Sequence, residues 1–116
     1  MMRRGEVRWY RFAQPDKRRP VVILTRDSII EYLGEVTVAP VTSTIRDIPS
    51  EVVLSPLDDM PGECAINLDH LQTVSKGRVG ALITTLPIEK IAHIRQALLF
   101  ALGFDPESTS LHGNGA

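Results

Sequence analysis

Three consecutive cations, Lys17, Arg18 and Arg19, stand directly before Pro20 and an apolar run. A residue that precedes proline is held in an extended conformation, so the backbone of Arg19 is restrained. A guanidinium on a restrained backbone suits phosphate binding, because its planar N–H groups can bond two oxygens at once. The same pattern is typical of a strand-edge arginine that discourages aggregation. The residues alone leave both interpretations of Arg19 open.

A second polar cluster, in the segment VTSTIR, places Thr42, Ser43 and Thr44 in a row and Arg46 two residues later. Hydroxyl groups at the end of a strand can donate hydrogen bonds to the nonbridging oxygens of a phosphate. Serine and threonine side chains that bond the nearby backbone of an ordinary turn give the same pattern.

The segment INLDHLQTVSKGR carries a third set of polar side chains. Asp69 and His70 are of the types that serve in general acid–base catalysis. Gln72 and Lys76 follow and offer polar and cationic contacts. A charged surface turn without a catalytic role is the alternative.

Metal and cofactor sites are not indicated by the residue pattern. The histidines, His70, His93 and His112, are far apart in the sequence and share no ligand spacing. Neither a glycine-rich phosphate loop nor a G-x-S-x-G nucleophile motif occurs. The single cysteine, Cys64, has no neighbour in sequence that would lower its pKa, and we predict a buried, unreactive thiol. We therefore expect no metal and no cofactor.

The charge is distributed unevenly along the chain. Residues 1–26 contain eight lysines and arginines against two acids, a net charge of +6, whereas residues 27–116 carry −7. Such asymmetry can mark a face that binds a polyanion. A basic hairpin that pairs with the acidic remainder of the same protein is the alternative.

The apolar segments before residue 86 are short, as expected for strands. Strands are predicted for EVRWYRF, PVVIL, EVTVAPV and EVVL, and short strands or turns for CAIN, LQTV and GALITTL. AQPDK is predicted to be a turn. The segment RDSIIEYLG is predicted to form a short helix capped by Asp27 or Ser28 and stopped by Gly34.

A longer helix is predicted near the C-terminus. Ile91, Ile94, Leu98 and Leu102 share one helical face, with Pro87 in the first turn and Gly103 as the stop. The fold class is therefore mainly β with a C-terminal helix, built as a strongly bent sheet or barrel. We expect one domain over residues 1–104 and a disordered polar tail over residues 105–116.

Hydrophobic residues make up 43% of the chain, which is enough for a folded core. There is no apolar run of about 18 residues and no signal-peptide pattern, so we expect a cytoplasmic protein.

The ordered set of segments RGEVRWYRF, RRPVVIL, TVAPVTS and LDHLQTVSKGRVG, followed by a helix, resembles the MazF/PemK family of toxin endoribonucleases. The resemblance spans residues 4 to 102. It implies an SH3-like barrel of the CcdB/PemK toxin type that assembles as a homodimer. It further implies metal-independent cleavage of single-stranded RNA, with mRNA as the expected target, and a cognate antitoxin whose C-terminal segment occupies the RNA groove.

The resemblance also implies roles for particular residues. Arg19 and Thr42 match the positions that the family uses for catalysis, with Ser43 as a helper, and Asp69 matches a position that is acidic in some members. The RNA 2′-hydroxyl would attack the adjacent phosphorus and leave a 2′,3′-cyclic phosphate and a 5′-hydroxyl. The residues expected to contact RNA are Lys17, Arg18, Arg46, His70, Gln72 and Lys76.

Some features depart from the family pattern or leave alternatives open. The AQPDKRRP segment is short and lacks the GSEQ-like stretch of many members, and Gln72 stands where several relatives have a cation. The general base is unassigned, because an arginine stays protonated, and Asp69 or His70 could take that role. Trp9, Tyr10 and Phe12 could stack on bases or fill the core. A gyrase-binding toxin of the same fold and a non-catalytic SH3-like adaptor are the other candidate functions.

Overall fold

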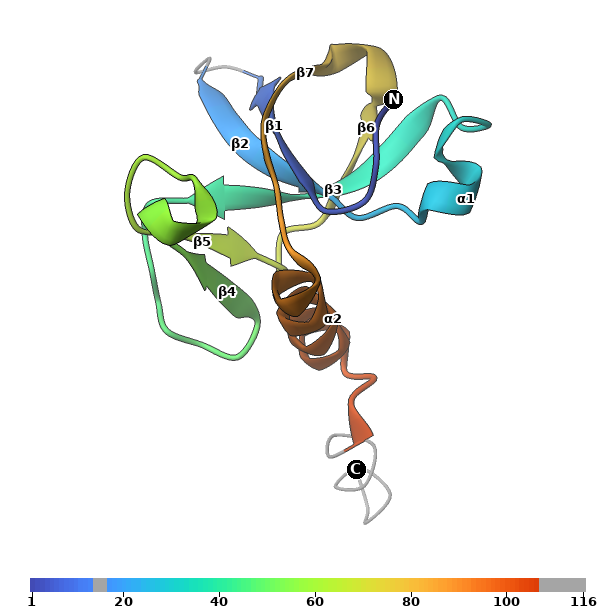
Figure 1. The fold of residues 1–116 in the computed structure, drawn as a ribbon. Helices are drawn as coiled ribbons and strands as arrows, with labels where there is room; N and C mark the ends of the chain where they lie inside the picture. The colour runs from blue at the N-terminus through green and yellow to red at the C-terminus, as the bar shows by residue number, and fades with distance from the viewer. Residues whose placement is uncertain (14–16, 107–116) are drawn as a thin grey trace.

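A computed structural model describes residues 1–13 and 17–106 of the chain (Figure 1). The strands are β1 Glu6–Arg11, β2 Arg18–Ile23, β3 Glu35–Thr42, β4 Glu51–Leu54, β5 Cys64–Asn67, β6 Gln72–Ser75 and β7 Val79–Thr85. The helices are α1 Asp27–Ile30 and α2 Ile88–Leu102, with short 3-10 turns at Pro56–Asp58 and Lys76–Arg78. The expected AQPDK turn falls largely on residues 14–16, and the expected tail largely on 107–116, so both predictions lie mainly outside the described residues. No helix among the described residues is long and apolar enough to cross a membrane.

The strands form one seven-stranded sheet, in which six follow the order β4-β5-β3-β2-β1-β7 and the seventh, β6, pairs with β3 outside this order. The long strand β3 pairs with β2 along one edge, while its other edge pairs first with β6 and then with β5. All these pairings are antiparallel. This confirms the mainly β class with a C-terminal helix. Within the described residues no ladder joins β6 to β7, so the sheet is strongly bent but not closed, and the term SH3-like barrel applies loosely.

The core lies on both faces of strand β2, which explains its continuous apolar sequence. Val22 belongs to a cluster that α2 covers, whereas Val21 and Ile23 belong to a second cluster that includes Ile30 of α1. All three β2 residues are fully buried. A strand buried on both faces reads as an unbroken apolar run because it has no solvent face to be polar. Strand β2 is therefore a rigid base for the residues at its two ends.

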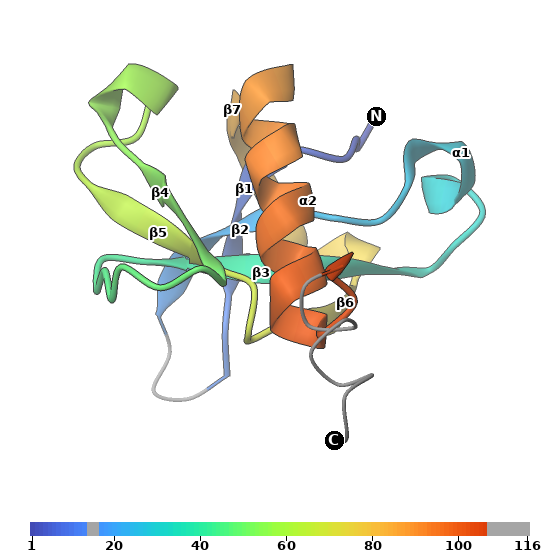
Figure 2. The ribbon, with the colours of Figure 1, turned by 90° about the horizontal axis from the view of Figure 1, so that it is seen from below.

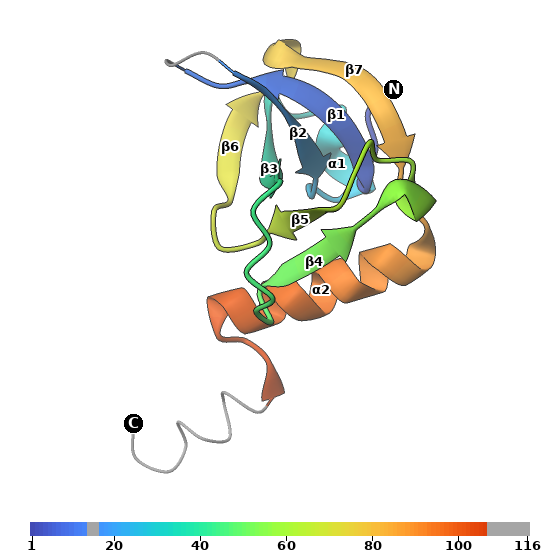
Figure 3. The same cartoon turned by 90° about the vertical axis from the view of Figure 1, so that its left-hand side faces the viewer.

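Helix α2 lies across the sheet and runs beside β4 (Figures 2 and 3). Ile94 and Ala97 are buried, and Ile91 and Leu98 pack partly against the same cluster. Gly103 ends the helix in the left-handed region, at φ 77°, as the sequence predicted. Leu102 is 53% exposed, so the predicted buried face is shorter than expected at its C-terminal end.

Helix α1 begins differently from the prediction. Its N-cap residue is Arg26, and neither Asp27 nor Ser28 caps it; no side-chain cap bond is found in the described part of the chain. The Asp27 carboxylate instead accepts a hydrogen bond from the backbone N–H of Arg4 at 2.6 Å. Asp27 therefore joins the N-terminal segment to α1, a long-range contact that local sequence does not indicate.

Candidate active site

Arg19 lies near the start of β2, where its backbone pairs with Tyr10 of β1. The next residues, Pro20 and then the buried Val21, fix the strand on which Arg19 stands. The Arg19 side chain itself is exposed. An arginine on a well-packed strand with its guanidinium toward solvent is held in place from behind and remains open to a ligand.

Thr42 is the last residue of β3 and pairs with Ala65 of β5. It is half-buried, and its Oγ1 accepts a hydrogen bond from the backbone N–H of Thr44 at 3.1 Å. That bond uses the oxygen as an acceptor, so the hydroxyl proton stays available for a donation elsewhere. Ser43 and Thr44 follow in the exposed loop.

Arg19 and Thr42 lie between two neighbouring hollows and line both. The larger, which we call the Arg19 pocket, has a volume of about 480 Å³. It is lined by Trp9, Lys17, Arg18, Arg19, Pro20, Val41, Thr42, Ser43, Met60, Pro61, Gly62, Glu63 and Cys64. The smaller, which we call the His70 pocket, has a volume of about 180 Å³. It is lined by Arg19, Pro40, Thr42, Thr44, Arg46, Asn67 and His70.

The cations of the Arg19 pocket have no partner of opposite charge among the described residues. Within residues 1–13 and 17–106, no carboxylate forms an ion pair with Lys17, Arg18 or Arg19. The Arg18 guanidinium lies over the ring of Trp9, 4.5 Å from its centroid. The pocket also contains Glu63, but the three adjacent cations form no ion pair with a described carboxylate, which leaves their positive charge for an external anion.

Other arginines of the basic N-terminal segment are engaged within the protein. Arg8 pairs with Glu6 at 2.8 Å, and Arg3 lies 3.9 Å from Asp27. The Nε of Arg4 donates to the carbonyl of Leu24 at 2.8 Å. Both interpretations of the +6 segment therefore apply, each to different residues: part of the charge is neutralised internally, and part lines the pocket.

The structure brings most of the candidate residues together. Seven of them line one or both pockets: Lys17, Arg18, Arg19, Thr42, Ser43, Arg46 and His70. They come from the start of β2 and the residue before it, from the end of β3 and the loop after it, and from the turn after β5.

Asp69, Gln72 and Lys76 line neither pocket. The carboxylate of Asp69 accepts a 2.5 Å hydrogen bond from Oγ of the buried Ser50. The Nζ of Lys76 donates to the carbonyl of Ile30 at 2.8 Å, beside α1. Gln72 is exposed on β6, opposite Val38 of β3. The predicted roles of these three residues stay predictions, and their positions do not support contact with a phosphate held in either pocket.

The aromatic residues of β1 divide between the core and the site. Tyr10 and Phe12 pack against the second core cluster, with their ring centroids 4.9 Å apart in an edge-to-face arrangement. Trp9 points to the other side and lines the Arg19 pocket. Alternation along a strand explains the split, because Trp9 faces opposite to Tyr10.

The sequence prediction missed the wall of the Arg19 pocket that comes from the loop before β5, including Met60 and Glu63. It correctly placed Cys64 in the interior. Burial, and secondarily the charge of Asp58, raise the pKa of the Cys64 thiol above its ordinary value of 9.0. The thiol is therefore protonated near neutral pH, and it is a poor nucleophile although it lines the pocket. Among the described residues, no group of three histidine, cysteine or acidic side chains is arranged to hold a metal ion.

The chain is a small β protein whose bent sheet is covered by a helix and carries, beside a threonine hydroxyl, cations without a described carboxylate partner, an arrangement suited to a phosphate-bearing ligand. Residues 3–102 match the family of PemK-like, MazF-like toxins of type II toxin–antitoxin systems. The chain belongs to this family.

Similar proteins include several from mycobacteria. The probable endoribonuclease MazF5 of Mycobacterium tuberculosis is 46% identical over 93 residues, which cover 79% of this chain and 80% of the relative. The solved structure of the Mycobacterium tuberculosis toxin MazF-mt6 aligns with a TM-score of 0.79 at 28% identity and covers 86% of this chain and 98% of that one. A mycobacterial endoribonuclease in complex with its cognate antitoxin aligns with a TM-score of 0.78 at 27% identity, covering 90% and 98% of the two chains.

Proposed function

We propose that this toxin-family chain is an endoribonuclease that cleaves single-stranded RNA, with Arg19 and Thr42 holding the scissile phosphate. The observation that carries the proposal is the position of these two side chains: both line both pockets, and Arg19 has no described carboxylate partner. The endoribonuclease relatives and the shared family are consistent with this activity.

The proposed reaction is an internal displacement. The RNA 2′-hydroxyl attacks the adjacent phosphorus, the bond to the 5′-oxygen breaks, and the products are a 2′,3′-cyclic phosphate and a 5′-hydroxyl. Negative charge grows on the nonbridging oxygens during the attack. The Arg19 guanidinium stabilises this charge, and the Thr42 hydroxyl donates to one of these oxygens, with Ser43 as a second donor.

The cations around the two pockets would bind the RNA backbone on either side of the reacting phosphate. Lys17 and Arg18 line the Arg19 pocket, and Arg46 lines the His70 pocket. A single strand suits these pockets, because unstacked bases can enter them and be read at their edges. The number of phosphates contacted sets how strongly salt weakens binding.

A cognate antitoxin and a second copy of the chain are the proposed protein partners, and the cytoplasm is the proposed location. One mycobacterial relative of this fold is solved with its antitoxin. An antitoxin segment with carboxylates would complement the unpaired cations of the Arg19 pocket and would compete with RNA for them.

The test is cleavage of a defined RNA oligonucleotide by the purified protein in the presence of EDTA, with the product ends mapped. We expect cleavage without metal, cyclic phosphate and 5′-hydroxyl ends, and loss of at least a hundredfold in rate for Arg19→Ala. Arg26→Ala is the matched control, because Arg26 is an exposed arginine at the N-cap of α1, beyond the other end of β2, and its replacement should leave the rate unchanged. Near-normal cleavage by a folded Arg19→Ala protein would contradict the assignment.

A further inference from the structure

Asn67 is a polar residue in a strand that is otherwise apolar. All four residues of β5 are buried, and Asn67 is 5% exposed. A buried amide is stable when its oxygen and nitrogen both find partners, and its orientation is then fixed by them. The partners of Asn67 therefore reveal what the side chain does.

The two ends of the Asn67 amide contact the turn that follows the strand. Its Oδ1 accepts a hydrogen bond from the backbone N–H of Asp69 at 2.9 Å. Because a backbone N–H donates and never accepts, the oxygen must lie on that side and the NH₂ group on the other. The Nδ2 of this NH₂ group lies 3.1 Å from Nδ1 of His70.

This contact determines the protonation pattern of the imidazole. An amide NH₂ donates, so Nδ1 of His70 must accept and carries no proton. In the neutral ring the proton then lies on Nε2. A ring that used Nε2 as a base would need its proton on Nδ1, and that proton would face the amide hydrogens and break the bond.

We propose that Asn67 is a positioning residue that holds His70 as the Nε2–H tautomer, so that His70 donates a hydrogen bond to RNA in the His70 pocket and is not the general base. This inference rests on the proposed function. His70 lines the pocket beside Arg19, Thr42 and Arg46, all of which are hydrogen-bond donors. A fourth donor suits a phosphate oxygen or a base acceptor in the same place.

The charged groups around His70 agree with a donor. Arg19 and Arg46 share its pocket, so two cations already lie beside the ring. The nearby carboxylate of Asp69 accepts from Ser50. A neutral donor therefore contributes a hydrogen bond beside the two cations without adding to their repulsion.

The first test reads the tautomer and does not depend on activity. Long-range ¹H–¹⁵N NMR spectra of the His70 ring, assigned with His70→Gln, should show an unprotonated Nδ1 and a protonated Nε2 near neutral pH. Asn67→Asp should reverse this pattern, because one carboxylate oxygen can still accept from the Asp69 N–H while the other now accepts from a protonated Nδ1. A protonated Nδ1 on the neutral His70 ring of the native protein would overturn the proposal.

The second test separates a donor from a base by kinetics. His70→Gln keeps an N–H donor and should retain most of the native kcat/KM, whereas His70→Ala should lose about tenfold to a hundredfold. Equal losses in the two variants would show that the imidazole itself is required, and would overturn the donor role.

A double-variant cycle tests whether Asn67 acts through His70. Asn67→Asp should lower kcat/KM as much as His70→Ala, and should have little further effect in a His70→Gln background. A persistent loss in that background would show that the added charge acts directly on RNA, and a faster Asn67→Asp enzyme would identify His70 as the base; either result contradicts the proposal. If Asn67→Asp does not fold, the NMR spectrum of the native protein still tests the tautomer, and the kinetics of His70→Gln and His70→Ala still test the donor role.

If the native protein cleaves no RNA, the proposed function and the donor role both fail. The NMR spectrum then still tests the tautomer.

Discussion

The ladder between β2 and β3 has two ends that differ in character. At one end lie Arg19 and Thr42 with the Arg19 and His70 pockets, lined by cations and hydroxyls. At the other end lies a larger hollow of about 710 Å³ beside α1 and the C-terminal half of α2. Figure 1 shows β3 running between them, from α1 toward β5. We call this second hollow the α1–α2 groove.

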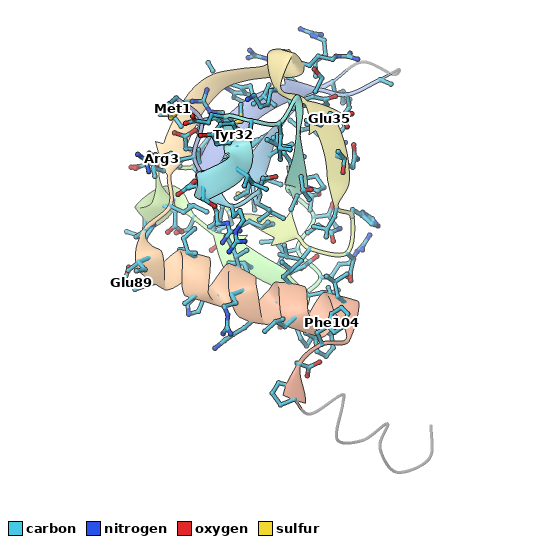
Figure 4. The ribbon with its side chains drawn as sticks, turned by 90° about the vertical axis from the view of Figure 1, so that its right-hand side faces the viewer. Met1, Arg3, Tyr32, Glu35, Glu89 and Phe104 are labelled. Carbon is cyan, nitrogen blue, oxygen red and sulfur yellow. The ribbon has the colours of Figure 1, made fainter. Side chains whose placement is uncertain are left out.

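The α1–α2 groove is mainly apolar, and of the arginines that line it, Arg4 donates a hydrogen bond through Nε to the Leu24 carbonyl. Leu24, Ile29, Leu33, Leu98 and Leu102 contribute side chains to it. Figure 4 views this side of the molecule, with Arg3, Tyr32 and Glu35 near α1 and Phe104 beyond α2. At this end the Asp27 carboxylate accepts a hydrogen bond from the backbone N–H of Arg4 and lies 3.9 Å from the Arg3 guanidinium.

The comparison shows that the number of arginines does not identify a site. Both ends carry several, and both are anchored by the same buried residues of β2. The two ends of the ladder differ in whether acceptor groups of the protein itself bond to the arginines. At the Arg19 end no described carboxylate does so, which leaves the charge for a ligand.

The largest effect is expected for Thr42→Val, which removes one hydroxyl and keeps the shape of the side chain. If Thr42 donates to the reacting phosphate, the cleavage rate should fall about 10²–10³-fold, the usual cost of losing one such donor. Single-turnover cleavage of an RNA oligonucleotide measures this rate.

Thr73→Val is the matched control for that experiment. Thr73 lies on β6 and lines the α1–α2 groove, so the same change there should leave the rate within twofold of the native protein. Equal losses in both variants would remove the distinction between the two ends of the ladder.

A smaller effect, on stability, is expected for Lys76→Met. This change keeps the stem and removes the ammonium that bonds the Ile30 carbonyl beside α1. The free energy of unfolding should fall by about 1 kcal/mol, which is the usual net contribution of one such hydrogen bond to stability. Urea denaturation measures it, and the salt dependence of RNA binding should not change. A reduced salt dependence would show that Lys76 contacts RNA after all.

The smallest effect is expected for Lys17→Met, on binding. Lys17 is exposed in the Arg19 pocket and has no described carboxylate partner, so its loss should change stability by less than about 0.5 kcal/mol. If it contacts one phosphate of a single strand, the slope of log K against log salt should become less steep by about 0.7. Fluorescence anisotropy over a salt series measures the slope. An unchanged slope would place Lys17 among the cations that do not contact RNA.

Much of the fold follows from local sequence patterns. The apolar runs predicted β1 to β4, and the helical spacing of Ile91, Ile94 and Leu98 predicted α2 with its glycine stop. These predictions were correct because a strand or helix is indicated by the spacing of the apolar residues within its own segment. The predicted cap of α1 was wrong because Asp27 bonds Arg4, 23 residues away.

The nearness of the candidate residues was predictable for those that stand at the ends of strands. Arg19 and Thr42 stand at the ends of neighbouring antiparallel strands, and such ends meet in space. Asn67 was missed, although an asparagine in the buried strand CAIN is a signal of a polar contact in the interior. The part of the pocket wall that contains Met60 and Glu63 comes from a loop whose path depends on distant contacts, and the sequence offered no signal for it.

By itself, the sequence determined the strand and helix pattern and, through the ordered motifs, the family, because these depend on residue types and short spacings. The roles of Arg19 and Thr42 came only as what that family resemblance implies. Only the tertiary structure decided which cations stay unpaired, because a charge is neutralised by whichever carboxylate the fold brings near it. It also decided that Lys76 bonds Ile30 and that Asp69 bonds Ser50, in contacts that span 46 and 19 residues. The orientation of His70 depends likewise on a buried amide whose partners exist only once β5 and its turn have formed.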